Sequence, residues 1–470
     1  MNYEKIDHLV ESMRDELIAD MKRWIAVPSV QGPAQENAPF GAENRRMLDL
    51  ALADARRYGF QTRDFEGYCG DISFGSGEQT MGMLCHLDVV PAGDGWIHDP
   101  WGAEIEDGRI YGRGTMDDKG PALCALYAMR AVRDAGVELR DGVRLILGCD
   151  EETGMSDMRH YAARTKLPDY GFSPDAEFPV INIEKGGLGL LLSAFTGGEG
   201  EADLPVYSLY AGERPNVVPG IARAEVGTAD FAALQAAVAR VAAEKDFKLT
   251  CEDLGSGRAA IVAEGVSAHA SMPHLGKNAA GMLLIALKAL EAGGNSRGSI
   301  AALADVLGLQ YDGAALGIAQ ADELSGALTC NLGILRYDGA HLTAQLDIRY
   351  PLCADEAAMC GAAAMALSGT GLALTRLNGH TPHHVPAEHK IVRGLLQVYH
   401  EVTGRDAYAF AIGGGTYSRM MPNTVAFGLN FPGDTDTCHM PDEYIDIEKM
   451  MLSVRIFAHA IAALASGEID

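Results

Sequence analysis

Hydrophobic positions recur every three or four residues over several long stretches of the chain. This periodicity predicts helices over residues 3–26, 42–58 and 119–136. The first two of these stretches also carry charged residues between the apolar positions, so we expect amphipathic helices there.

Two unbroken apolar runs, residues 81–90 and 143–149, show a different pattern. Their length and composition predict strands that are buried on both faces. Each is followed by a helical stretch, the second of which begins near Ser156. Alternating strands and helices predict an α/β core whose sheet is at least partly parallel.

The composition changes after about residue 185, where glycine and alanine become more frequent. An Ala-rich helical stretch at 231–245 occurs here together with strand-like segments at 258–270 and 341–351. This mixture predicts a separate α+β domain. A long helix is predicted at 447–465, near the end of the chain.

The first pattern returns from about residue 380. We therefore predict one discontinuous α/β domain made of residues 1–185 and 380–470, with residues 186–379 inserted as the second domain. The insert is long enough to hold two similar halves, although no repeat is visible in its sequence.

Composition and charge narrow the possible functions. The 470 residues are 48% hydrophobic and carry a formal net charge of −26, which disfavours nucleic acid and anionic membranes as partners. The charged start of the chain predicts no secretory signal, and no apolar run is long enough to predict a membrane span. Its nine cysteines include no CxxC pair, so we expect reduced thiols and a cytoplasmic protein.

Acidic residues and histidines gather where the predicted strands end. In open α/β sheets, ligands bind at the carboxyl ends of the strands. The candidates are His86, Asp88, Asp117, Asp118, Asp150, Glu151, Glu152, Asp175 and His439. Imidazole and carboxylate groups together form a ligand set for zinc, manganese or cobalt, and one or two such cations would offset the crowded negative charge.

Each candidate also has a purely structural alternative. His86 could be a hydrogen-bonded core histidine. Asp117 and Asp118 could cap the helix that begins near Lys119, and the acids at 150–152 could favour a helix start. Cys85 and Cys149 lie beside the candidates, but neighbours along a strand point to opposite faces, so we expect small core residues rather than ligands there.

Five segments in a fixed order carry a family resemblance. They are HLDVVPAG at 86–93, GRGTMDDKG at 112–120, DEE at 150–152, PDAE at 174–177 and CHMP at 438–441. Together they resemble the M20 family of metallopeptidases, and most closely its PepV-type dipeptidases, also called Xaa-His or β-Ala-Xaa dipeptidases. This resemblance implies an αβα-sandwich catalytic domain with an inserted α+β lid.

The resemblance implies two divalent metal ions, usually zinc, with manganese or cobalt as alternatives. His86 and Asp175 would bind one ion, Glu152 and His439 would bind the other, and Asp117 would bridge both. The peptide bond after Asp117 is often cis in this family. Two such ions share a water and lower its pKa toward about 7.

The resemblance also implies roles for residues that bind no metal. Asp88 would orient the imidazole of His86, and Glu151 would be the general base. His269, in GVSAHASMP, would stabilise the tetrahedral oxyanion. Asn216 and Arg349 would bind the substrate's carboxylate or the oxyanion, and the loop containing Gly414, Gly415 and Thr416 would line the carboxylate end. A purely structural role stays open for His269, and a structural salt bridge for Arg349.

The expected activity is hydrolysis of dipeptides with free amino and carboxyl ends. The alternative is deacylation of N-acyl amino acids, which uses the same amide chemistry. A non-enzymatic peptide-binding protein is disfavoured, because all five ligand positions and Glu151 are occupied by suitable residues. The expected partner is a small peptide substrate. The long insert resembles the doubled lid that supplies its histidine within one chain, so a monomer is expected to suffice.

Overall fold

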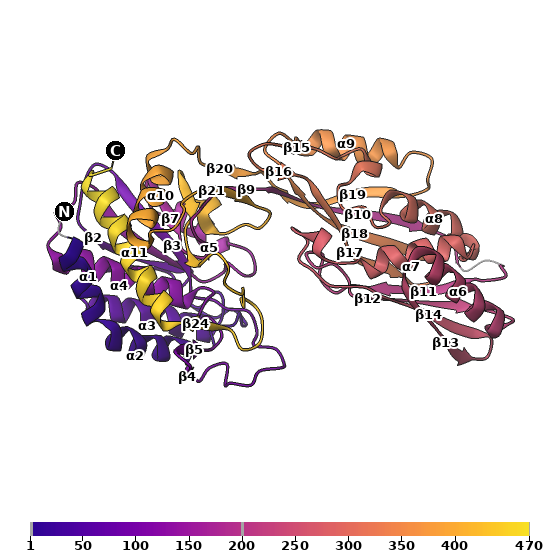
Figure 1. Cartoon of the computed structure of the whole chain (residues 1–470), viewed down its shortest axis with the longest axis horizontal. Coiled ribbons are helices and arrows are strands. Elements are labelled where there is room, and N and C mark those ends of the chain that lie inside the picture. The colour runs from indigo at the N-terminus through magenta and orange to yellow at the C-terminus, as the bar shows by residue number, and fades with distance from the viewer. Residues whose placement is uncertain (1–2, 199–201, 470) are drawn as a thin grey trace. The chain divides into compact units, whose positions relative to one another are not determined.

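The structure is a computed structural model that describes residues 3–198 and 202–469. The described residues form two compact units. Unit 1 comprises the segments 1–183, 384–410 and 415–470, and unit 2 the segments 184–383 and 411–414. In Figure 1 the indigo N-terminal and yellow C-terminal segments therefore belong to the same unit. Each unit has its own hydrophobic core.

The helices of unit 1 come from both ends of the chain. They are α1 (Tyr3–Ser12), α2 (Arg14–Ile25), α3 (Ala42–Arg57), α4 (Lys119–Ala135), α5 (Ser156–Ala162), α10 (Lys390–Thr403), the 3-10 helix η4 (Tyr417–Met420) and α11 (Ile447–Ser466). The prediction of a single helix over 3–26 is wrong. The helix is interrupted at Met13, where φ is −94° and ψ is 0°, and becomes α1 and α2. The Ser12 hydroxyl donates to Leu9 O at 2.7 Å, and such local bonds compete with the helical pattern.

The main sheet of unit 1 has a parallel centre. Its path runs β1-β2-β6-β3-β7-β22-β9-β20, and β21 also pairs with β9. The strands are β1 (Gln61–Phe65), β2 (Cys69–Phe74), β3 (Thr80–His86), β6 (Gly142–Gly148), β7 (Tyr170–Ser173), β9 (Val180–Glu184), β20 (His383–His384), β21 (Ala409–Ile412) and β22 (Thr424–Ala426). β6, β3, β7 and β22 are mutually parallel, so their carboxyl ends share one edge.

Both faces of this sheet are covered, as the apolar runs predict. Cys85 and Leu147 belong to the large core that the helices α1–α4, α10 and α11 share. Leu84 and Ile146 belong to a smaller core with residues of α5 and η4. The αβα arrangement is therefore confirmed, with a thin second helical layer. Cys85 and Cys149 are core residues, as predicted.

Unit 1 also contains two smaller sheets. Three strands form an antiparallel sheet in the order β24-β5-β4, and two form a parallel pair. They are β4 (Glu104–Glu106), β5 (Arg109–Tyr111) and β24 (Tyr444–Asp446), and the pair β8 (Ala176–Glu177) and β23 (Leu429–Asn430).

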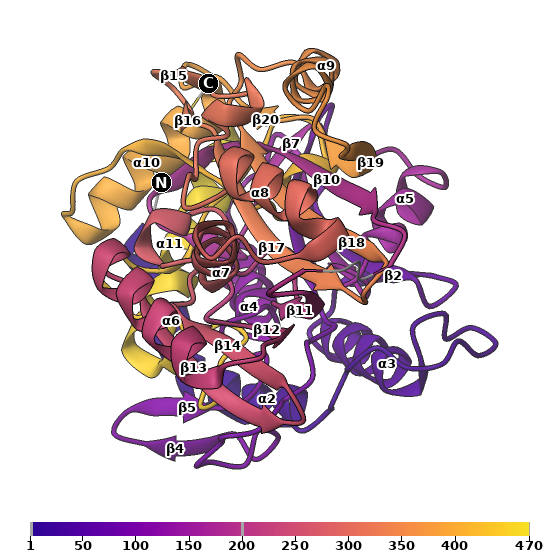
Figure 2. The same ribbon diagram turned by 90° about the vertical axis from the view of Figure 1, so that its right-hand side faces the viewer.

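Unit 2 is an antiparallel sheet with helices packed against it. The sheet order is β13-β14-β12-β11-β17-β18-β10-β19, and α6, α7 and α8 lie over the strands in Figure 2. The strands are β10 (Gly186–Phe195), β11 (Val206–Ala211), β12 (Ile221–Gly227), β13 (Lys248–Gly255), β14 (Arg258–Glu264), β17 (Thr329–Tyr337), β18 (His341–Tyr350) and β19 (Ala373–His380). A separate hairpin pairs β15 (Ala321–Asp322) with β16 (Gly326–Ala327). The helices are α6 (Phe231–Lys245), η1 (Pro273–Leu275), α7 (Ala279–Ala289), η2 (Gly294–Ser296), α8 (Arg297–Val306), η3 (Ala314–Leu316) and α9 (Glu356–Ala366).

The two halves of this sheet follow the same path from its centre to opposite edges. In one half, β11 and β12 lead through α6 to the edge strand β13. In the other half, β17 and β18 lead through α9 to the edge strand β19. The predicted α+β class of the insert is confirmed. No described helix in either unit is both long enough and apolar enough to span a bilayer.

Candidate metal centre

The parallel strands of unit 1 deliver the candidate ligands to one edge of the sheet. His86 is the last residue of β3, Glu151 and Glu152 follow β6, and Asp175 follows β7. Because these strands are parallel neighbours, the side chains meet without any long excursion of the chain.

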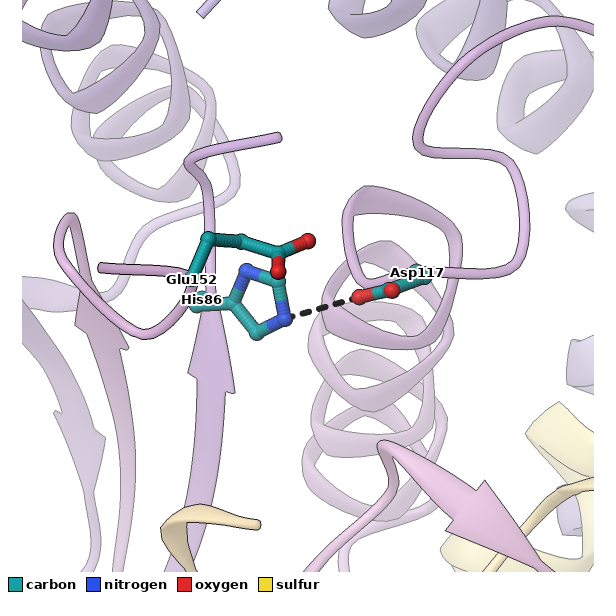
Figure 3. A group of neighbouring side chains, drawn as sticks. All are labelled: His86, Asp117 and Glu152. Atoms are coloured by element: carbon teal, nitrogen blue, oxygen red, sulfur yellow. Dashed lines mark ion pairs between the residues drawn. The ribbon is translucent and has the colours of Figure 1, made fainter. Parts of the chain in front are cut away.

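Asp117 joins the candidates into one cluster. Its Oδ1 lies 2.9 Å from His86 Nε2, and its Oδ2 lies 2.8 Å from His439 Nε2. Figure 3 shows the imidazole of His86 directed at this carboxylate. On one side of Asp117, His86 Nε2 is 3.6 Å from Asp175 Oδ2, and on the other, His439 Nε2 is 2.9 Å from Glu152 Oε1. The peptide bond between Asp117 and Asp118 is cis.

The donor set fits divalent cations. His86 Nε2 is buried and forms no hydrogen bond with a described residue, although Asp117 lies close by. Ligand atoms of His86, Asp117 and Glu152 all lie within 4.8 Å of one another. In the described ranges, no lysine or arginine forms an ion pair with these acids or with Asp175. Nitrogen and carboxylate ligands without a protein cation among them favour zinc-like metals.

Burial and crowding shift the pKa values of the acids. Burial raises the pKa of Glu151 well above its ordinary value and also raises the pKa of Glu152 and Asp175. Burial acts the same way on Asp117, but the contacts from His439 and His86 outweigh it and lower the pKa of Asp117. Hydrogen bonds to Asp117 and Glu152 raise the pKa of His439 to about 11. The cluster therefore favours added positive charge.

Asp88 orients two parts of the centre at once. His86 Nδ1 lies 2.9 Å from the main-chain oxygen of Asp88 and 3.5 Å from its Oδ1. The Asp88 carboxylate accepts the backbone N–H groups of Glu151 at 3.2 Å and Glu152 at 3.1 Å. Asp88 is 2% exposed, so these bonds hold the turn after β6 in a site shielded from water.

Two aspartates from the predicted set hold backbone rather than facing the cluster. Asp150 accepts the Ser156 N–H at 3.0 Å and the Ser156 hydroxyl at 2.5 Å, so it stabilises the start of α5. Asp118 accepts the N–H of His86 at 2.8 Å and makes no side-chain cap bond to α4. Asp118 therefore does not cap α4, and the capping alternative is wrong for this residue. Asp150 does have a structural role, because it binds the first residue of α5.

The sequence reasoning missed two buried acids that support the site. Asp157 accepts the N–H groups of Cys149 at 2.6 Å and Asp150 at 2.9 Å, and also the hydroxyl of Tyr417. Glu443 accepts the N–H of Asp117 at 3.2 Å. Glu443 lies beside the late histidine motif, which could have drawn attention to it. Asp157 lies in an ordinary polar stretch without such a signal.

The remaining candidates of the insert lie close together within unit 2. Val217, the neighbour of Asn216, forms an isolated bridge with His269. His269 is exposed, and its Nδ1 lies 2.7 Å from Ser271 Oγ. A side chain at Gly413 would approach Ser271 Cβ to 2.6 Å, so only glycine fits there.

Arg349 is held by an ion pair of its own unit. Its Nε and Nη2 lie 2.6 Å and 3.0 Å from the two carboxylate oxygens of Asp347. Its Nη1 donates to Gly413 O at 3.1 Å. The structural salt bridge that the sequence left open is therefore present.

The glycine-rich loop crosses the division between the units. Gly414 is the last residue of the segment assigned to unit 2, and Gly415 and Thr416 begin the next segment of unit 1. The Thr416 hydroxyl accepts the N–H of Ser418 at 3.1 Å and so caps η4.

Comparison with known proteins supplies the family. Residues 82–463 match the sequence profile of peptidase family M20/M25/M40. The chain belongs to this family. Members of the M20 family are metallopeptidases, which agrees with the ligand set at the sheet edge.

The M20 relatives match along almost the whole chain. YtjP of Bacillus subtilis (strain 168) is 36% identical over 476 residues, which cover 99% of this chain and 100% of YtjP. The Beta-Ala-Xaa dipeptidase of Lactobacillus delbrueckii subsp. lactis is 35% identical over 464 residues, covering 98% of both chains. Human carnosine dipeptidase 1 shares the fold, with a TM-score of 0.59, 15% identity and 99% coverage of both chains.

Proposed function

We propose that this M20 protein is a metal-dependent dipeptidase that cleaves the amide bond of dipeptides with free amino and carboxyl ends. The observation that carries the proposal is the cluster around Asp117, which joins two histidines and two further acids, Glu152 and Asp175, with no lysine or arginine paired to these acids in the described ranges. Near-full-length similarity to a Beta-Ala-Xaa dipeptidase supports the substrate class.

The proposed ligands divide into two groups that share Asp117. His86 and Asp175 would hold one divalent ion, and Glu152 and His439 would hold a second, because the histidine of each pair lies beside a different oxygen of Asp117. Zinc is the expected metal, with manganese or cobalt as alternatives. When bound, such ions polarise an amide carbonyl and make water a better nucleophile.

Glu151 is proposed as the general base. Its carboxylate forms no hydrogen bond or ion pair with any other residue of the described ranges, and its backbone is fixed by Asp88. Burial raises the pKa of Glu151 well above its ordinary value, which makes this carboxylate a stronger base than an exposed glutamate. Glu151 would take the proton of the attacking water and deliver it to the leaving amine.

Residues of unit 2 and the glycine-rich loop at 414–416 are proposed to supply substrate contacts. His269 would stabilise the oxyanion, and Asn216 together with the N–H groups of the loop at 414–416 would receive the terminal carboxylate. Arg349 is already engaged by Asp347 and Gly413, so its proposed part is to fix the start of that loop. The insert has two halves of like path, as a doubled lid would, so a monomer is proposed to suffice.

The proposed setting is the cytoplasm. All nine cysteines are free in the structure, as expected of thiols kept reduced. The proposed activity implies a small peptide as the partner rather than a macromolecule.

A substrate panel tests the proposed function. The protein is stripped with a chelator, reloaded with zinc, manganese or cobalt, and assayed on Ala-Ala, β-Ala-His and N-acetyl amino acids. Hydrolysis of the dipeptides at rates well above those of the N-acetyl compounds is expected. Activity confined to the N-acetyl set would replace the dipeptidase by an N-acyl-amino-acid deacylase. Absence of turnover with every metal would overturn both.

A further inference from the structure

Glu443 connects two distant segments of unit 1. It follows His439 by four residues and directly precedes β24. Its main-chain oxygen accepts the N–H of Gly112 at 2.8 Å, which extends the pairing of β24 with β5 by one residue. The residue is 0% exposed, and its side chain turns toward the segment that leads to Asp117.

The Glu443 carboxylate binds this segment through four bonds. Oε1 accepts the backbone N–H groups of Gly114 at 3.0 Å, Met116 at 2.8 Å and Asp117 at 3.2 Å. Oε2 lies 2.5 Å from Nη1 of Arg113, which is 1% exposed. Charge-assisted bonds in a buried setting are strong and directional, so the path of the backbone into Asp117 depends on this one side chain.

No other described group does the same work. The N–H groups of Gly114, Met116 and Asp117 have no second acceptor among the described residues. Lys119 holds the far side of the turn, donating from Nζ to Trp24 O at 3.3 Å and Val27 O at 2.5 Å. Without Glu443, these three N–H groups next to the cluster, two of them on buried residues, would lose their partner.

We propose that Glu443 is a positioning residue for the metal centre. It sets the main chain of Asp117 and, through its own place in the chain, the loop that carries His439, so that both side chains meet at the distances described above. It touches neither metal nor substrate. This inference rests on the proposed metal-dependent function.

Two substitutions and a matched control test the inference. Glu443→Gln keeps the size of the side chain but removes its charge. One carboxylate oxygen is replaced by an amide N–H₂, which cannot accept the hydrogen bonds from Arg113 or the backbone, and the remaining oxygen is a weaker acceptor. Glu443→Asp keeps the charge but withdraws the acceptor by one methylene. Asp141→Asn is the control, because Asp141 is a 1% exposed carboxylate that accepts the Tyr170 hydroxyl at 2.7 Å and precedes β6 at the end opposite the cluster.

The readout is the affinity of each metal-free protein for zinc, measured by competition with a chromogenic chelator, alongside circular dichroism to verify folding. Both Glu443 variants are expected to bind zinc roughly 10–100-fold more weakly than the wild type, the range seen when groups that orient ligands are removed. Asp141→Asn is expected to bind as the wild type does, even if it melts earlier.

Each outcome has one meaning. If the wild type binds no zinc, manganese or cobalt, the proposed function fails, and the Glu443 inference with it. If the wild type binds and both Glu443 variants bind equally well, only the positioning inference is overturned. If Asp141→Asn lost as much zinc affinity as the Glu443 variants, the effect would reflect general stability, and the positioning inference would also be overturned. Should Glu443→Gln not fold, Glu443→Asp decides.

Discussion

Glu151 and Glu152 are neighbours in the chain whose carboxylates meet different partners. Glu152 lies 2.9 Å from His439, whereas the Glu151 carboxylate has no bonded partner among the described residues. Asp88 fixes both backbones through separate carboxylate oxygens. Two residues that are adjacent in the sequence can therefore have different proposed roles, metal binding for Glu152 and proton transfer for Glu151.

Replacing each glutamate by glutamine should separate these jobs. Glu151→Gln removes the proton acceptor and is expected to lower kcat by about 10²–10⁴-fold, the usual contribution of a general base. Its zinc content, measured by atomic absorption after dialysis, should stay close to that of the wild type. Glu152→Gln should instead lose metal. A Glu151→Gln protein with wild-type kcat would remove Glu151 from the mechanism.

The sequence predicts residues that a motif marks, and it cannot predict what a buried side chain bonds. His86 and Asp117 stand in motifs at a strand end and before a helix, His439 stands in a loop motif, and the structure brings the three together. Asp157 and Glu443 are also buried acids, but no motif marks their partners. Asp157 accepts backbone N–H groups across the turn after β6, and Glu443 accepts those of a segment far along the chain. Only the folded chain defines those pairs, so neither residue could be assigned beforehand.

At the scale of the element, apolar pattern predicted strands and helices well where one pattern ran without interruption. The helix predicted over 231–245 is α6, and the strand predicted over 341–351 is β18. The strand predicted over 258–270 ends earlier, at Glu264, because Val266 pairs with Lys277 outside the sheet. Pairing with a distant partner leaves no trace in the local pattern.

The start of α5 offers a test at this scale. Asp150 is 4% exposed and receives the N–H and the hydroxyl of Ser156. Asp150→Ala leaves these donors without a partner and is expected to lower the free energy of unfolding by about 1–3 kcal/mol. Asp150→Asn retains an acceptor and should recover part of that loss. The measurement is urea unfolding. Loss of zinc with unchanged stability would instead make Asp150 a ligand.

At the scale of the whole molecule, the two units differ in how metal should affect them. All the proposed ligands lie in unit 1, whose core is separate from the core of unit 2. A ligand that binds only the folded state stabilises it, by about 2.7 kcal/mol at 100 times its Kd. Metal binding should therefore stabilise unit 1 and leave unit 2 unchanged.

Calorimetry of the zinc-loaded and chelated protein tests this division. Removing zinc should lower the Tm of one transition by about 5–10 °C, since about 1 kcal/mol corresponds to roughly 2–4 °C in a domain of this size. The second transition is the internal control and should not move. If the Tm of both transitions fell, metal binding would stabilise both units. If neither Tm changed, the folded protein would not bind zinc.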